Sequence, residues 1–331
     1  MRLLFVFTGG TIGSTLSGDV ISTDVDKSYK IIEAYRERYG IDFEYDMLEP
    51  YTALSENNTG DTLRMLCECV RENAARGYDG IIVTHGTDTL AYSSAALGYA
   101  LGLDTIPVCV VSSNRPIEHE RANALDNLHG AVSFIRGGCG RGCFVVYRND
   151  NSDTVRVHRA SRLLGPKAYS DDVSSIFGCV YGHFDAGFDF IKNDRYREGA
   201  DEIAPIPSVS LGESSDAVLM IHSYPGMRYP CLAPEVRYVI VNTYHSGTLD
   251  TCSDRARRFY LSCKERGITV YATGVDSGPD YASAQAFSEL GITPAVNISP
   301  VSVYVKLWML GSVDSDARLH MSSSLSGDIM I

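Results

Sequence analysis

The sequence has 331 residues, of which 44% are hydrophobic and 21% charged, and its formal net charge is −12. This length predicts two domains of ordinary soluble composition. The acidic balance, without a dense basic cluster, argues against nucleic-acid binding, and no apolar run approaches the roughly 20 residues of a membrane-spanning helix. Nine cysteines, an odd count, without a signal-peptide core indicate free thiols in a reducing compartment, so we expect a cytoplasmic protein.

The first predicted element is a buried parallel strand at Leu3–Phe7, a short apolar run with branched and aromatic side chains. It leads directly into the segment 8–15 (TGGTIGST), in which two adjacent glycines permit a sharp turn. Hydroxyl side chains therefore gather just past the carboxyl end of a strand. In open α/β sheets this is where ligands bind.

Strands and helices then alternate along the first half of the chain. We expect helices at about 27–38, 61–76, 90–101 and 121–135, and strands at 43–47, 78–84, 106–111 and 144–147. Strands that alternate with helices of about 10–15 residues are typical of βαβ units in a parallel sheet.

The second half of the chain repeats this rhythm after an irregular stretch. Residues 149–185 are polar and are expected to be irregular, and the segment after them has little periodicity. Further strands are expected at 217–221, 236–241 and 268–272, with helices at 253–266, 282–290 and 301–310. The polar tail after Gly311 is expected to be mobile.

These elements predict an α/β protein with two α/β domains, a larger N-terminal parallel-sheet domain and a smaller C-terminal α/β domain. The expected limits are 1–191 for the N-terminal catalytic domain, 192–215 for a linker and 216–331 for the C-terminal domain.

A second polar loop follows the strand at 78–84 and opens a helix. Its sequence is His85-Gly86-Thr87-Asp88-Thr89. Free backbone N–H groups at a helix N-terminus bind anions such as a carboxylate, and the Asp88 carboxylate beside them suits an ammonium group. The pair would satisfy a zwitterionic amino acid. For Thr89 itself, a role as the helix N-cap is the stronger interpretation.

Thr11 and Thr87 each carry a hydroxyl that could act as a nucleophile. A threonine hydroxyl is weak at its resting pKa and needs a neighbouring base or proton relay. Two threonines on neighbouring strand-end loops, together with a carboxylate, would supply a nucleophile, a relay and an orienting group.

Together, the motifs around Thr11 and Thr87 resemble the bacterial-type asparaginase/glutaminase family, and the lack of a signal peptide is similar to its cytosolic type I L-asparaginase branch. The resemblance extends to Ser55-Glu56-Asn57, to 244–248 and to 299–307, so it covers nearly the whole chain. It implies hydrolysis of the side-chain amide of L-asparagine to L-aspartate and ammonia. It also implies a homodimer or homotetramer, and no metal or organic cofactor.

The resemblance also implies roles for individual residues. Thr11 would be the nucleophile that forms an acyl-enzyme, Thr87 the second catalytic threonine, and Asp88 the partner of the substrate ammonium group. Ser55 and Glu56 would contact the ends of the amino-acid substrate. The donors expected for developing negative charge are the backbone amides near Gly10 and Gly86.

The family has a lysine beside the second threonine, and Lys167 is the only lysine between Asp88 and His183. A buried lysine can shift its pKa and pass protons, which favours a catalytic role for Lys167. The alternative is a solvated loop lysine, which the preceding Gly165-Pro166 also fits.

The chain departs from the family pattern at several places, including Asn123-Ala124 and the residues before Lys167. The tyrosine that covers the nucleophile in many members has no clear match; the nearest registers give Val20 or Ile21, and Tyr29 is a possible replacement. The acidic residue often found at the start of the last helix is Val301 here.

These departures leave a second function open, a catalytically impaired amino-acid binding or sensing protein on the same fold. A third, the related amidotransferase that works on charged tRNA, has an extra N-terminal domain, whereas this chain starts at the first strand. Asparagine and glutamine differ by one methylene, so the sequence does not separate them.

Overall fold

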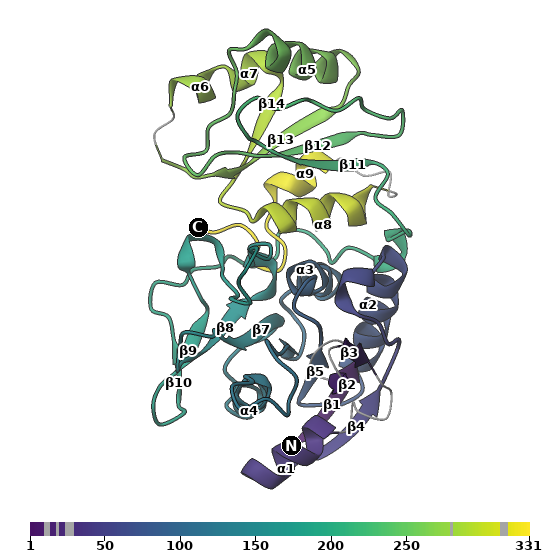
Figure 1. The fold of residues 1–331 in the computed structure, drawn as a ribbon, viewed down its shortest axis with the longest axis vertical. Coiled ribbons are helices and arrows are strands. Elements are labelled where there is room, and N and C mark those ends of the chain that lie inside the picture. The colour runs from purple at the N-terminus through teal and green to yellow at the C-terminus, as the bar shows by residue number, and fades with distance from the viewer. Residues whose placement is uncertain (10–13, 18–19, 24–29, 279–280, 312–316) are drawn as a thin grey trace.

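The structure is a computed structural model that describes residues 1–9, 14–17, 20–23, 30–278, 281–311 and 317–331. Its two main sheets lie one above the other, with a helix between them (Figure 1). This arrangement confirms the predicted α/β class with a larger N-terminal sheet. The limits 1–191, 192–215 and 216–331 stay a prediction.

The larger sheet has the strand order β10-β9-β8-β7-β6-β5-β1-β4. The run from β7 to β4 is parallel, as predicted, and β8, β9 and β10 are antiparallel. The bounds of these strands are β1 Arg2–Phe7, β4 Glu44–Leu48, β5 Gly80–Thr84, β6 Val108–Val111, β7 Cys143–Arg148, β8 Val155–Arg159, β9 Gly182–Phe184 and β10 Phe190–Lys192.

Part of the stretch 149–185 is therefore not irregular, and that prediction was wrong. β8 and β9 extend the sheet from β7. Their sequences, VRVHR and GHF, mix charged and small residues with apolar ones. On β8, Arg156 is exposed, whereas His158 and Arg159 are buried and hydrogen-bonded to other parts of the chain.

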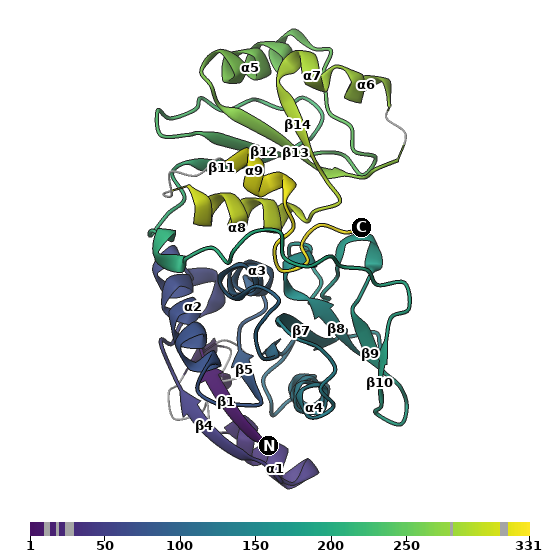
Figure 2. The ribbon, with the colours of Figure 1, turned by 180° about the vertical axis from the view of Figure 1, so that it is seen from behind.

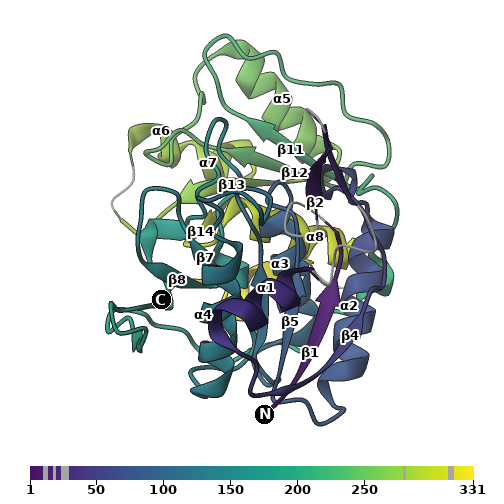
Figure 3. The same ribbon diagram turned by 60° about the horizontal axis from the view of Figure 1, so that its bottom comes forward.

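Helices cover both faces of the larger sheet, because successive side chains of a strand point to opposite faces. On β1, Leu4 and Val6 pack toward α2 (Gly60–Ala74) and α3 (Leu90–Leu101). Leu3 and Phe5 pack toward α1 (Lys30–Tyr39) and α4 (Ala124–Arg136), which lie together on the other face (Figure 3). Sheet and helices enclose two apolar layers, which fix the positions of the strand ends.

The smaller sheet is parallel and has the order β11-β12-β13-β14. Its β14 was not predicted. A separate hairpin pairs β2 with β3. The bounds are β2 Ser14–Ser17, β3 Val20–Thr23, β11 Val218–His222, β12 Tyr238–Asn242, β13 Thr269–Val275, β14 Ile292–Val296, α5 Asp254–Glu265, α6 Ala282–Gln285, α7 Phe287–Leu290, α8 Pro300–Leu310 and α9 Ala317–Ser322.

Helix α8 joins the two sheets (Figure 2). Val301 and Val305 pack into the core of the larger sheet, whereas Val303 and Leu307 pack into the core of the smaller one. The helix is apolar on nearly all sides because both sides are buried. It also contacts α3, the helix that starts at the Thr87 loop.

The chain end was expected to be mobile, but residues 324–328 are buried, so that prediction was wrong for them. Asp328 is fully buried and pairs with the fully buried Lys306 of α8 at 2.8 Å. The Tyr99 hydroxyl donates to the same carboxylate at 3.0 Å. The charged groups here are thus compatible with burial, because Asp328 is paired with Lys306 and also accepts from Tyr99.

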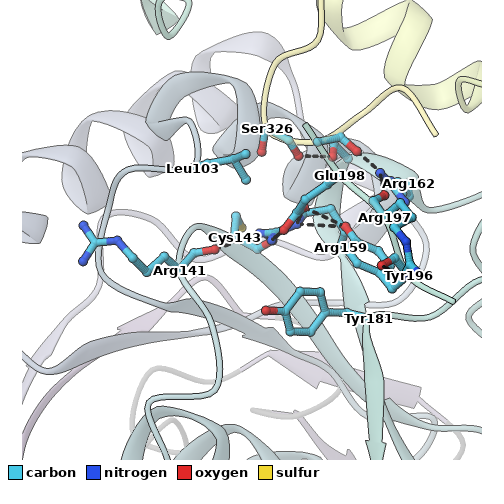
Figure 4. Close-up of polar contacts among 12 residues, drawn as sticks. Leu103, Arg141, Cys143, Arg159, Arg162, Tyr181, Tyr196, Arg197, Glu198 and Ser326 are labelled. Carbon is cyan, nitrogen blue, oxygen red and sulfur yellow. Dashed lines mark hydrogen bonds and ion pairs between the residues drawn. The ribbon is translucent and has the colours of Figure 1, made fainter. Parts of the chain in front are cut away.

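An ion pair between the buried Arg159 and the partly buried Glu198 fixes the segment after β10 to the sheet (Figure 4). The Arg159 guanidinium donates to Glu198 through Nη2 at 2.8 Å and through Nε at 3.0 Å. It also lies over the Phe144 ring, 4.1 Å from the centroid. None of the helices within the described ranges is long and apolar enough to cross a membrane.

Candidate active site

The two predicted loops begin at the ends of adjacent strands. Phe7 of β1 is paired with Thr84 of β5. The hydroxyl of the following residue, Thr8, donates to the Thr84 carbonyl at 2.8 Å. The side-chain hydrogen bond joins the two strand ends just where their loops start. Both loops therefore leave the sheet side by side, as expected for parallel neighbours.

Gly9 brings a third segment to this place. Its φ is +89°, and a Cβ built on it would lie 2.6 Å from the Ala53 carbonyl oxygen. Only glycine tolerates both the positive φ and this approach. The Ala53 N–H in turn donates to the Thr8 carbonyl at 3.1 Å. Residues 53–58 are thereby held against the end of β1.

Gly10 and Thr11 lie outside the described residues, as does Tyr29, the possible replacement for the covering tyrosine. The role of Thr11 stays a prediction. The structure does describe the residues before Thr11: β1 and Gly9 lead the chain to the point where the Thr87 loop begins.

Ser55 and Asp88, both predicted as substrate-binding or catalytic residues, are in contact. The buried Ser55 hydroxyl donates to Asp88 Oδ2 at 3.2 Å. Asp88 itself is exposed, so the other faces of its carboxylate remain open to a ligand. Glu56, the next residue after Ser55, is also exposed and does not line the cavity that contains Asp88.

Thr89 stands at the N-cap position of α3, but its side chain does not cap the helix. Its hydroxyl donates instead to the Ser55 carbonyl at 2.8 Å and accepts from the Asn58 amide at 3.1 Å. The predicted role as N-cap is thus correct for the position and wrong for the hydrogen bond. Thr89 links the Ser55 segment to the Asp88 loop.

His85 supports this link as a neutral imidazole. Its Nδ1 lies 2.8 Å from the carbonyl of the buried Gly86, and its Nε2 lies 3.2 Å from the Asn58 amide nitrogen. With the proton assigned to Nδ1, Nε2 is free to accept from Asn58. Burial lowers the pKa of His85, and the hydrogen bond to Gly86 opposes this shift only in part.

Thr87 and Asp88 open into a cavity of about 520 Å³, which Lys167 and Asp171 also line. This volume suits a small-molecule ligand. Lys167 is exposed, in a short turn with Ser170, rather than buried. In the described part of the chain, its ammonium group has no hydrogen bond or ion pair. The structure therefore brings Lys167 to the same cavity as Thr87 in the solvated form considered above.

The loop that carries Lys167 adds negative charge to the cavity. Partial burial raises the pKa of the Asp171 carboxyl; Arg115 opposes the rise, and Asp150 and Asp88 increase it. A site with several carboxylates around one cavity attracts a ligand that carries a positive group. A substrate ammonium group would meet this requirement.

Three residues that contribute here were not assigned roles from the sequence: Asn58, His85 and Asp171. Asn58 and His85 lie next to or within the motifs named above, and Asp171 follows Lys167 by four residues. Asn58 and His85 lie in segments that meet only in the folded chain, so no local pattern connects them. Among the described residues, no group of three or more His, Cys, Asp or Glu side chains is arranged to hold a metal ion.

A sequence model of the family described as "Asparaginase, N-terminal" matches residues 2–170, just over half of the chain. The chain belongs to the asparaginase family. This confirms the family predicted from the Thr11 and Thr87 motifs, and it supports hydrolysis of an amide as the reaction.

Two curated relatives of this asparaginase-family chain match it nearly end to end. The L-asparaginase of Thermococcus kodakarensis is 27% identical over 349 residues, with 99% of each chain covered. A glutamyl-tRNA(Gln) amidotransferase chain of Thermofilum pendens is 26% identical, with 96% of this chain and 72% of the relative covered. The family thus includes relatives of two different activities at similar distance.

A solved structure shares the whole fold. The thermostable L-asparaginase from T. kodakarensis aligns with a TM-score of 0.78 at 23% identity, and 100% of both chains are covered. The likeness confirms the two-domain α/β architecture.

Proposed function

We propose that this protein hydrolyses the side-chain amide of L-asparagine to L-aspartate and ammonia. The observation that carries the proposal is the Ser55–Asp88 hydrogen bond at the ends of β1 and β5, beside the glycine that leads to Thr11. In this proposal Asp88 binds the substrate ammonium group, and Ser55 orients Asp88. Family membership and the L-asparaginase relative support the same reaction.

The proposed mechanism uses Thr11 as the nucleophile. Its hydroxyl attacks the amide carbonyl, and its proton passes through a relay of Thr87 and Lys167 to the amide nitrogen. The C–N bond then breaks, ammonia leaves, and an acyl-enzyme remains on Thr11. Backbone amides near Gly10 and Gly86 stabilise the oxyanion, and water then hydrolyses the ester to release aspartate. Lys167 lines the same cavity as Thr87, which supports its place in this relay.

The test is ammonia release from asparagine and from glutamine by the purified protein. Thr11→Ala is expected to lower kcat at least about 10³-fold, and Lys167→Ala about 10²–10⁴-fold. Lys30→Ala, at an exposed position on α1, is the matched control and should leave kcat unchanged. An active Thr11→Ala variant would contradict the assignment of the nucleophile.

The amidotransferase relatives favour a second candidate, an ammonia-supplying protein that acts on glutamine together with a protein partner. The sites of both candidates accept an amino-acid amide, so the difference lies in the amide and the partner. Glutamine hydrolysis that rises on addition of a tRNA-binding partner protein would support this candidate. Turnover of asparagine by the chain alone would favour the first.

The remaining alternative is an amino-acid binding or sensing protein. It predicts calorimetric binding of aspartate or asparagine with negligible turnover, and ordinary enzymatic rates of about 1–10³ per second would exclude it. Assembly into a homodimer or homotetramer is part of the proposal, and a sedimentation mass measures it directly.

A further inference from the structure

The loop that carries Lys167 is closed at its base. The Leu164 N–H donates to the Ser174 carbonyl at 2.8 Å, and the Val173 N–H donates to Asn149 Oδ1 at 3.0 Å. Lys167 therefore projects from a short, hydrogen-bonded base made of residues 161–164 and 173–174, which we call the neck. Since the Lys167 side chain itself makes no hydrogen bond within the described residues, its place at the cavity is set by this backbone.

Helix α8 holds the strand-side half of the neck through two buried serines. Ser299 Oγ donates to the Leu163 carbonyl, and Ser302 Oγ donates to the Ser161 carbonyl. Both serines are fully buried. The carbonyls they bind lie only a few residues before Lys167, so these hydrogen bonds tie the start of the loop to α8.

Ser299 occupies the N-cap position of α8, yet its side chain does not cap that helix. A serine at this position usually accepts from a backbone N–H of the first turn, as Ser253 does on α5 by accepting from Ala256 at 3.2 Å. The Ser299 hydroxyl is directed instead to another part of the chain. The Ser299 hydroxyl therefore stabilises the neck rather than the N-terminus of α8.

The C-terminal segment holds the same neck from a second side (Figure 4). Arg162 Nε donates to the Gly327 carbonyl at 2.6 Å, and Ser161 Oγ donates to the Ser326 carbonyl at 2.6 Å. Arg162 and Ser161 are both fully buried. Each of the residues 161, 162 and 163 thus bonds to α8 or to the chain end.

We propose that α8 and the C-terminal segment form a brace that positions the Lys167 loop, with Ser299, Ser302 and Arg162 as positioning residues. The kinetic consequence rests on the proposed function, in which Lys167 relays a proton. Catalytic groups lose rate steeply when displaced by about 1 Å. The brace would therefore make the N-terminal site depend on residues of the C-terminal domain.

Hydrogen–deuterium exchange of the full chain tests the brace without any measurement of activity. The Ser299→Ala/Ser302→Ala variant should exchange the backbone amides of residues 164–173 at least about tenfold faster than the parent, while the core amides of β5 stay protected. Ser253→Ala is the matched control, because it removes a serine that caps its own helix. Unchanged exchange at 164–173 in the double variant would overturn the proposal.

Kinetics distinguish positioning from a purely structural role. Per folded molecule, as measured by circular dichroism, Ser299→Ala should lower kcat about tenfold with little change in KM, and Ser299→Thr should restore kcat by returning the hydroxyl. Faster exchange with unchanged kcat in an active enzyme would overturn the positioning role. If the parent enzyme releases no ammonia, the proposed function fails, and the exchange experiment still decides whether the brace holds the loop.

Discussion

At the residue scale, the site depends on one backbone approach and one side-chain contact. Gly9 brings residues 53–58 against the end of β1, and Ser55 in that segment then orients Asp88. The contact between Ser55 and Asp88 thus depends on the approach at Gly9, whereas the approach does not depend on the contact. A change at Gly9 should therefore lower stability, whereas a change at Ser55 should lower kcat/KM.

Gly9→Ala should lower the free energy of unfolding by about 1–3 kcal/mol, since a Cβ would add strain at φ +89° and meet the Ala53 carbonyl oxygen at 2.6 Å. Gly40→Ala is the matched control, with φ +74° but no atom within 4 Å of the added Cβ. Urea denaturation of both variants measures the difference. Equal losses would show that the close approach at Ala53 has no energetic effect.

Ser55→Ala should lower kcat/KM for asparagine about tenfold while the protein stays folded, because a hydrogen bond to a charged group contributes about 1.5–3 kcal/mol. Asp88→Asn should have the larger effect, since it removes the charge that binds the substrate ammonium group. Steady-state ammonia release measures both. A Ser55→Ala enzyme with parental kcat/KM would separate Ser55 from the site.

At the element scale, the strands predicted correctly are those that a local run of apolar residues marks in the sequence. β1, β5, β6 and β7 are apolar along their length because both faces are covered, and such runs stand out. β8 and β9 were missed because they are mixed in composition and pair antiparallel toward the edge of the sheet, and because β9 spans only Gly182–Phe184.

The chain end was missed for a different reason. Its burial depends on Lys306, which lies 22 residues before its partner Asp328, and on Tyr99 from α3. A polar segment is predicted to be exposed unless its hydrogen-bond and ion-pair partners are known. These partners come together only in the folded protein. The Ser55–Asp88 contact is of the same kind: the residues were predicted from motifs, whereas their hydrogen bond required the tertiary structure.

Lys306→Met should destabilise the protein by about 3–5 kcal/mol, because it leaves the fully buried Asp328 carboxylate without its cation. Lys264→Met is the control, since Lys264 is exposed on α5. Thermal and urea unfolding of both variants, and of Lys306→Met combined with Asp328→Asn, measure the coupling. Additive losses in the double variant would argue against an energetic pair.

At the scale of the whole molecule, α8 and the chain end connect the two domains. Val301 and Val305 of α8 belong to one core and Val303 and Leu307 to the other. Unfolding of the smaller domain would thus expose apolar surface of the larger one. We therefore expect a single cooperative transition, and its stability should respond to buried titratable groups in either part.

His158 is the clearest of these groups. It is buried on β8, with Nδ1 2.8 Å from Ser175 Oγ, and burial, with a smaller contribution from Arg156, lowers its pKa to about 3. In the unfolded chain a histidine has a pKa of about 6.5, so between these values the unfolded state binds a proton that the folded state does not. Stability is fully present above about pH 6.5 and falls as the pH is lowered toward 3.

The contribution of His158 should amount to about 2 kcal/mol of lost stability between pH 7 and pH 5. His85, whose pKa burial also lowers, acts in the same direction. His158→Asn retains a group able to hydrogen bond Ser175 but does not titrate, so urea unfolding across this range should show a shallower pH dependence than the parent. His245→Asn, at an exposed position, is the matched control. If both variants show the same pH dependence, the buried imidazole of His158 is not what makes the fold sensitive to acid.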